Sequence, residues 1–139
     1  MGSYIMLELS KREKKIAREL IEKGLREEFK RGMLSFDAIL QQWKNENGDV
    51  KENYYKIFTA VKDFDKQIAR RYDGLSGSRY LDTVIGQLAD ELYDISEIEE
   101  FRPEVKETML RSLKWMREVK NLRSLENFVS FGVLTKSSL

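Results

Sequence analysis

Hydrophobic residues recur every three or four positions along most of this chain, and this spacing places side chains on one face of an α-helix. The first such segment opens with Ser10 and Glu13, three residues apart as in a capping box, and its apolar positions continue toward Gly32. We predict a first helix from Ser10 to Gly32. The apolar positions that define it are Ile16, Ala17, Leu20, Ile21, Leu25 and Phe29.

A shorter helix is expected next, with Ser35 as its N-cap and an Asn-Gly pair at positions 47 and 48 as its end. The pair is also common in β-hairpins, but its flanks do not alternate between apolar and polar residues, so we interpret it as a turn between helices. Gly24, inside the first helix, costs about 1 kcal/mol relative to alanine and therefore indicates either a bend or a close crossing by another helix.

The clearest helical pattern lies over residues 49–74, where apolar and aromatic residues follow one face and Gly74 provides the ending. A fourth helix is predicted from about Ser78, which would be its N-cap. The inward positions of the third helix are Tyr54, Ile57, Phe58, Val61, Phe64, Ile68 and Tyr72, and those of the fourth are Leu81, Val84, Ile85, Leu88 and Leu92.

The C-terminal part predicts a short helical turn over residues 94–104 and then a fifth, long helix, for which Pro103 is suited to the first position. A last short helix is expected near residues 125–131. The inward positions of the long helix are Val105, Met109, Leu113 and Met116.

These segments together predict an all-α protein, an irregular array or bundle of about five helices, because their lengths differ too much for a symmetric bundle. The 139 residues fit a single domain with a sizeable core. We expect a flexible N-terminus over residues 1–9, a helical domain over residues 10–131 and a polar tail over residues 132–139.

Composition narrows the possible chemistry. The chain is 41% hydrophobic and 35% charged with a net charge of +1, so it is too apolar for disorder and has no overall positive field for nucleic acid. It contains no cysteine and no histidine, which excludes disulfides, Cys/His zinc sites and Ser-His-Asp triads. No convergent acid, base and nucleophile can be identified among the other residues, so we predict no catalytic activity, no metal and no cofactor.

No window approaches the roughly 18 uninterrupted apolar residues of a membrane span, and the N-terminus lacks the pattern of a signal peptide. We therefore expect a cytoplasmic protein that does not contact membranes.

Asp65 is unusual because it falls in the middle of the apolar face of the third helix. A carboxylate buried there would need a cation, since an unpaired buried charge costs several kcal/mol. Arg79, after the glycine corner, is the partner we expect. The pair would be a structural ion pair that orients the corner, although a carboxylate that binds a ligand, or an exposed one, fits the same pattern.

The corner itself, "IARRYDGLSGSRYLDT" over residues 68–83, combines arginines with glycines and serines. Helix ending and capping account for the glycines and serines. The arginines suggest a second possibility, because a helix start flanked by guanidinium groups can hold a phosphate or carboxylate. The candidate anion-binding residues are Arg70, Arg71, Ser78 and Arg79.

Two tryptophans and uneven charge suggest contacts with other chains. Trp43 and Trp115 are candidate interface residues, and Trp115 falls away from the inward face of its helix. Residues 90–107 are acidic and residues 111–123 are basic, as expected for complementary surfaces or for solvated helix faces. The leading hypothesis is a helical module that binds another protein or its own copy. The alternative is a nucleic-acid or phosphate-ligand binder that uses the arginine corner and the basic first helix.

Overall fold

The computed structural model describes the backbone of residues 7–137 and the side chains of residues 7–126. The described residues form helices and connecting turns without a strand, so the all-α prediction is confirmed, with four α-helices in place of about five. Two short 3₁₀ turns separate the later helices. The elements are α1 (Lys11–Glu46), α2 (Val50–Tyr72), η1 (Gly77–Arg79), α3 (Tyr80–Ala89), η2 (Ile95–Ile98) and α4 (Pro103–Ser137).

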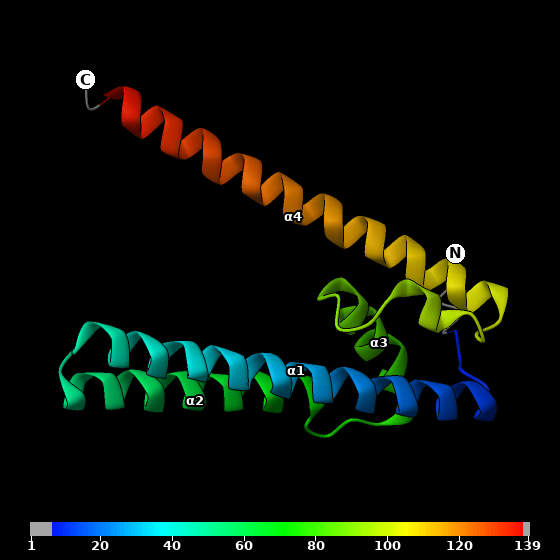
Figure 1. Cartoon of the computed structure of the whole chain (residues 1–139). Helices are drawn as coiled ribbons and strands as arrows, with labels where there is room; N and C mark the ends of the chain where they lie inside the picture. The colour runs from blue at the N-terminus through cyan, green and yellow to red at the C-terminus, as the bar shows by residue number, and fades with distance from the viewer. Residues whose placement is uncertain (1–6, 138–139) are drawn as a thin grey trace.

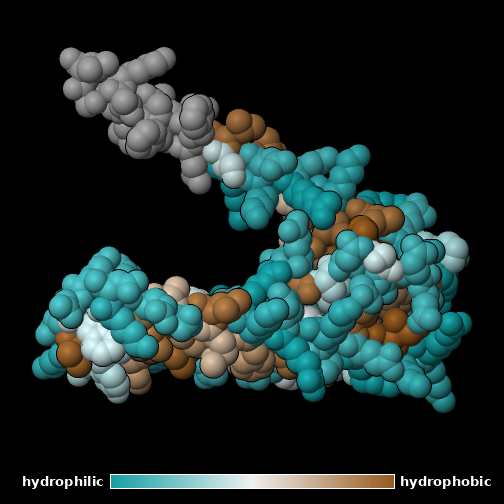
Figure 2. All heavy atoms as spheres, viewed as in Figure 1, coloured by the Kyte–Doolittle hydropathy of each residue, from teal (hydrophilic) through white to brown (hydrophobic). Residues whose placement is uncertain are grey.

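The helices form two arms that diverge from a common base. Helices α1 and α2 lie side by side as a long antiparallel hairpin, and the short α3 packs on α1 near the base of that hairpin (Figure 1). Helix α4 packs on α3 and then extends away from the hairpin. The space-filling view shows the open space between the two arms (Figure 2). Much of each arm therefore lies outside the core.

Helix α1 corrects the predicted division into two helices. It is a single helix of 36 residues in which Gly32 is not an end and Ser35 is not an N-cap. Gly32 instead permits close packing, because a Cβ atom there would lie 2.7 Å from Cε2 of Phe64 on α2. The predicted end at Asn47 is confirmed, since this residue adopts the left-handed conformation with φ of 50°.

The predicted capping box at the start of α1 is also confirmed. Glu13 N–H donates to Ser10 Oγ at 3.1 Å, and Ser10 N–H donates to Glu13 Oε1 at 3.0 Å. Glu13 additionally accepts a hydrogen bond from the Arg102 N–H at 3.0 Å and faces the Arg102 guanidinium at 3.3 Å. The buried carboxylate of Glu13 thus joins the start of α1 to the residue that precedes α4.

We expect Glu13→Gln to lower the free energy of unfolding by about 1–2 kcal/mol at neutral pH, because one accepting oxygen becomes an NH2 group that cannot accept and the remaining bond loses its charge assistance. Burial alone would raise the pKa of Glu13, but hydrogen bonds from the Ser10 and Arg102 N–H groups and the Arg102 charge together hold it below the usual 4.5. The carboxylate therefore stabilises the fold above about pH 4.5 and loses this effect as the pH falls further. Urea unfolding of the wild type and the variant, above and below about pH 4.5, would measure this effect. A difference in unfolding free energy that is the same at every pH would contradict the prediction.

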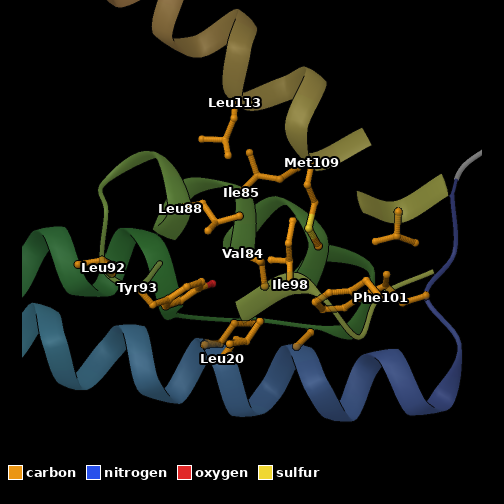
Figure 3. Close-up of a cluster of buried hydrophobic side chains, with 14 residues drawn as sticks. Leu20, Val84, Ile85, Leu88, Leu92, Tyr93, Ile98, Phe101, Met109 and Leu113 are labelled. Carbon is orange, nitrogen blue, oxygen red and sulfur yellow. The ribbon is translucent and has the colours of Figure 1, made fainter. Parts of the chain in front are cut away.

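The hydrophobic core lies where α3 and the first turns of α4 meet α1 (Figure 3). The predicted inward positions Val84, Ile85, Leu88 and Leu92 are buried. In α4, three of the four predicted positions are buried, and Met116 is exposed. The buried positions of α4 are Val105, Met109 and Leu113. Beyond them α4 has left the core, which explains the exposure of Met116.

Helix α2 has the clearest amphipathic pattern, yet none of its residues is fully buried. Most of its apolar positions are at best partly covered, and Tyr54, Phe58 and Val61 remain exposed. The pattern correctly predicted the helix, but only the end of its apolar face, at Tyr72, packs against the core.

The ends of the chain differ from the predicted boundaries. The backbone of α4 continues through the predicted separate helix at residues 125–131 and includes residues 132–137 of the predicted tail. At the other end of the chain, residues 1–6 of the predicted flexible N-terminus lie outside the described residues, as do residues 138–139 of the predicted tail. Leu9, which was also predicted to be flexible, is buried in the core. Among the described helices, none combines the length and the apolar character needed to cross a membrane.

Candidate functional site

The corner between α2 and α3 begins at Asp73 and Gly74. Asp73 N–H donates to the Ala69 carbonyl to end α2, and Gly74 then adopts a φ of 67°, as predicted for the residue that ends this helix. Ser78 does not cap α3, because it lies inside the η1 turn and its hydroxyl pairs with that of Ser76 at 3.0 Å. Helix α3 starts at Tyr80 without a side-chain cap.

The structure does not bring Asp65 and Arg79 together. Asp65 is exposed, so it needs no buried cation, and Arg79 is also exposed and donates to the Asp73 carbonyl oxygen at 3.4 Å. The predicted buried ion pair between them is therefore replaced by a contact within the corner. Asp65 lies on the part of α2 that α1 does not cover, which its position on the helical face could not reveal.

Of the candidate anion-binding arginines, Arg71 points toward the interior and Arg70 is exposed. Arg71 Nη1 lies 2.6 Å from Glu28 Oε1 on α1, and Nη2 pairs with Asp90 at the end of α3. The Glu28 side chain is only 6% exposed and that of Arg71 is 24% exposed, so this ion pair is shielded from solvent. Arg71 therefore joins three helices and is not available to a ligand at the corner in this arrangement.

A chain of hydrogen bonds extends from Glu28 into the core. Tyr72 O–H donates to Glu28 Oε1 at 2.5 Å, and Gln87 Nε2 donates to the Tyr72 oxygen at 3.0 Å and to the Ile21 carbonyl at 2.9 Å. Tyr93 O–H in turn donates to Gln87 Oε1 at 2.9 Å. We call the six residues whose side chains take part the junction cluster: Glu28, Arg71, Tyr72, Gln87, Asp90 and Tyr93.

Burial raises the pKa of both tyrosines in the junction cluster. Burial first, and then the hydrogen bond to the Glu28 carboxylate, raises the pKa of Tyr72 to about 12. Burial also raises the pKa of Tyr93 above the usual range. Both hydroxyls therefore stay protonated and act as hydrogen-bond donors, which suits them to linking the helices.

An open cleft of about 510 Å³ borders the junction cluster between the hairpin and α4. Arg31 lines it, and its guanidinium donates to the Asp90 and Glu91 carbonyls at 2.9 and 2.7 Å. Its lining is mostly polar and includes Glu28, Ser35, Gln67 and Lys120. Among the described residues, no group of three or more carboxylates is arranged to hold a metal ion. Glu28 and Asp90 instead both pair with Arg71.

The two candidate interface tryptophans have different surroundings. Trp43 is half-buried, and its indole N–H donates to the Gly48 carbonyl at 3.1 Å. This hydrogen bond stabilises the turn at the tip of the hairpin. Trp115 on α4 is 65% exposed. It lines an open cleft of about 520 Å³ together with Ile85 and Met116. Only Trp115 is thus placed to contact another molecule with most of its ring.

Sequence reasoning missed the centre of the junction cluster. Glu28 is separated from Gly24 by four residues and from Leu20 by eight, so it lies on the inward face of α1. Gln87 directly precedes Leu88 in an otherwise apolar stretch of α3. The reasoning that selected Asp65, a polar residue on an apolar face, would have selected Glu28 as well.

No protein-family model matches the chain, and comparison with curated proteins and with solved structures finds no match.

Proposed function

We propose that this protein is a cytoplasmic protein-binding module without catalytic activity, whose two helical arms bind other polypeptide chains. The observation that carries the proposal is the number of large apolar side chains exposed along both arms. Monomeric soluble proteins rarely expose large contiguous apolar patches, and such patches are characteristic of interaction sites. On the α4 arm these side chains are Leu110, Trp115, Met116, Leu122 and Leu125.

The arrangement of the polar residues supports the same proposal. Near the open cleft, the Glu28 carboxylate, the Gln87 amide and the two tyrosine hydroxyls are linked by hydrogen bonds, which favours a role in holding the arms to the base over a role in chemistry. Arg71, which the nucleic-acid alternative requires at the corner, is engaged by Glu28 and Asp90. The proposal therefore rests on the arms and not on the corner.

The proposal can be tested with a photoreactive benzophenone amino acid placed at one position at a time in the cells that produce the protein. Positions 54 and 115, on the hairpin and on α4, are the test positions, and the exposed positions 18 and 99 are matched controls. We expect illumination to link the arm positions to polypeptide, either another copy or a different protein, at least several-fold more than the controls. Equal yields at all four positions would overturn the proposal.

A further inference from the structure

One side of the hairpin arm carries a largely apolar surface that no other part of the described structure covers, with the exposed carboxylate of Asp65 on its α2 side. It consists of six large side chains, three from each helix, with exposed fractions between 37% and 66%. Within each helix the three lie three, four or seven residues apart, so they share one side of that helix. We call them the hairpin face: Phe29, Met33 and Leu40 on α1, and Tyr54, Phe58 and Val61 on α2.

The two halves of the hairpin face form one continuous surface. Phe64, one turn beyond Val61 on α2, packs edge-on against Phe29 at a centroid distance of 5.6 Å and against Phe36 at 5.7 Å. Toward the tip, the rings of Tyr54 and Phe58 stack at 6.5 Å. Hydrophobic residues are visible along this arm in the space-filling view (Figure 2).

The exposed area of the hairpin face approaches that of a protein interface. If each large side chain exposes roughly 200 Å² when fully accessible, the observed exposed fractions correspond to about 600 Å² of surface. This value is at the upper end of the patches that monomers expose. A stable interface buries about 800 Å² on each partner, including a polar rim, so the hairpin face would supply most of it.

The shape of the surface indicates its partner. A hairpin of two antiparallel helices with one apolar side is half of a four-helix bundle, and the missing half needs the same length and the same pattern. From Phe29 to Glu46, α1 rises about 27 Å beyond the base, enough for five helical turns of contact. A second copy provides a matching half through a two-fold axis, and the net charge of +1 produces little repulsion between copies.

We propose that two copies of this chain pack hairpin face against hairpin face to form an antiparallel four-helix bundle, while α4 remains outside the interface. This inference rests on the proposed function, because it names the partner that the hairpin arm binds.

Sedimentation equilibrium of the full chain tests the dimer directly. We expect the wild type at micromolar concentration to have twice the mass of one chain. The double variant Met33→Glu/Phe58→Glu places two charges on each hairpin face and should sediment as one chain. The control Trp115→Glu/Leu122→Glu alters two α4 side chains that are about as exposed and should remain dimeric. Circular dichroism would verify that both variants keep the helical content of the wild type.

A cross-linking experiment examines the two-fold geometry without disturbing the face. Phe64 contacts Phe29 and Phe36, so Val61, one turn toward the tip, lies near the middle of the hairpin face and close to the expected axis. The chain has no cysteine, so Val61→Cys introduces a single thiol. A short bismaleimide should join two Val61→Cys chains in high yield and two Leu122→Cys chains in low yield.

A monomeric wild type, or a dimer that only the α4 variant dissociates, would overturn the proposed bundle, as would equal cross-linking at the two cysteine positions. These failures are distinguishable from failure of the proposed function. A monomer that still gives arm-specific benzophenone links to other proteins would refute the dimer and leave the protein-binding function standing. Absence of both the dimer and the links would refute both.

Discussion

Replacing Glu28 by alanine is expected to lower the free energy of unfolding by about 2–3 kcal/mol, because it removes the hydrogen bonds from Arg71 and Tyr72 to a buried carboxylate. The change leaves the guanidinium of Arg71 with Asp90 as its only carboxylate partner in the junction cluster and deprives the Tyr72 hydroxyl of its acceptor. It also removes the polar link between α1 and the end of α2. Chemical denaturation with linear extrapolation would measure the loss.

Two companion variants make this result specific. Glu22→Ala removes an exposed ion pair with Arg26 from the same helix and should cost no more than about 0.5 kcal/mol. Glu28→Gln keeps an oxygen acceptor for Tyr72 but not the charge. Its loss of unfolding free energy should therefore lie between those of Glu22→Ala and Glu28→Ala. If Glu28→Ala were as mild as Glu22→Ala, the junction cluster would not hold the helices together.

Gly24→Ala is expected to destabilise the protein by about 2–3 kcal/mol, although alanine is the better helix former by about 1 kcal/mol. A Cβ atom at position 24 would lie 2.3 Å from Nε2 and 2.5 Å from Cδ of Gln87. The Gln87 amide cannot move away without losing its hydrogen bonds to Ile21, Tyr72 and Tyr93. Thermal and urea unfolding would both reveal the change.

Gly86→Ala is the matched control for Gly24→Ala. Gly86 also lies inside a helix, but a Cβ atom there would meet only Arg71 Nη2 at 3.8 Å. Alanine at position 86 should therefore be neutral or stabilising by up to about 1 kcal/mol. Combining Gly24→Ala with Gln87→Ala should cost less than the sum of the two single changes, because the shorter side chain makes room. Additive costs would mean that the predicted clash does not occur.

Several features of the fold were predictable because local patterns determine them. The capping box at Ser10 and Glu13, the left-handed end at Asn47 and the position of Pro103 all depend on residues within one helical turn. The buried apolar positions of α3, Val84, Ile85 and Leu88, followed from their helical spacing.

The two glycines of α1 show where local reasoning is insufficient. Gly24 was expected to mark either a bend or a close crossing, and the structure places it at a crossing with α3. Gly32 was predicted to end a helix but instead leaves room for Phe64 to pack against α1. A glycine that makes room for a neighbour and a glycine that ends a helix look identical in one sequence, because the neighbour is far away along the chain.

The arginines of the corner illustrate the same limit for the candidate site. Arg70, Arg71 and Arg79 are equivalent as charges in the sequence, but only Arg71 points toward α1 and reaches Glu28, 43 residues earlier. Asp65 and Glu28 both lie on apolar faces, yet one is exposed and the other is buried. An amphipathic face shows which residues would be covered if a partner element were present, but it does not show whether one is.

The sequence by itself determined the helical class, the two ends of α1 at Ser10 and Asn47 and the residue types available for chemistry, because each depends on local spacing or on composition. Only the tertiary structure decided which apolar faces are covered, which arginine is paired and which face of the hairpin is left open. These outcomes depend on contacts between residues tens of positions apart, and the free energy of such contacts exists only after the helices have packed.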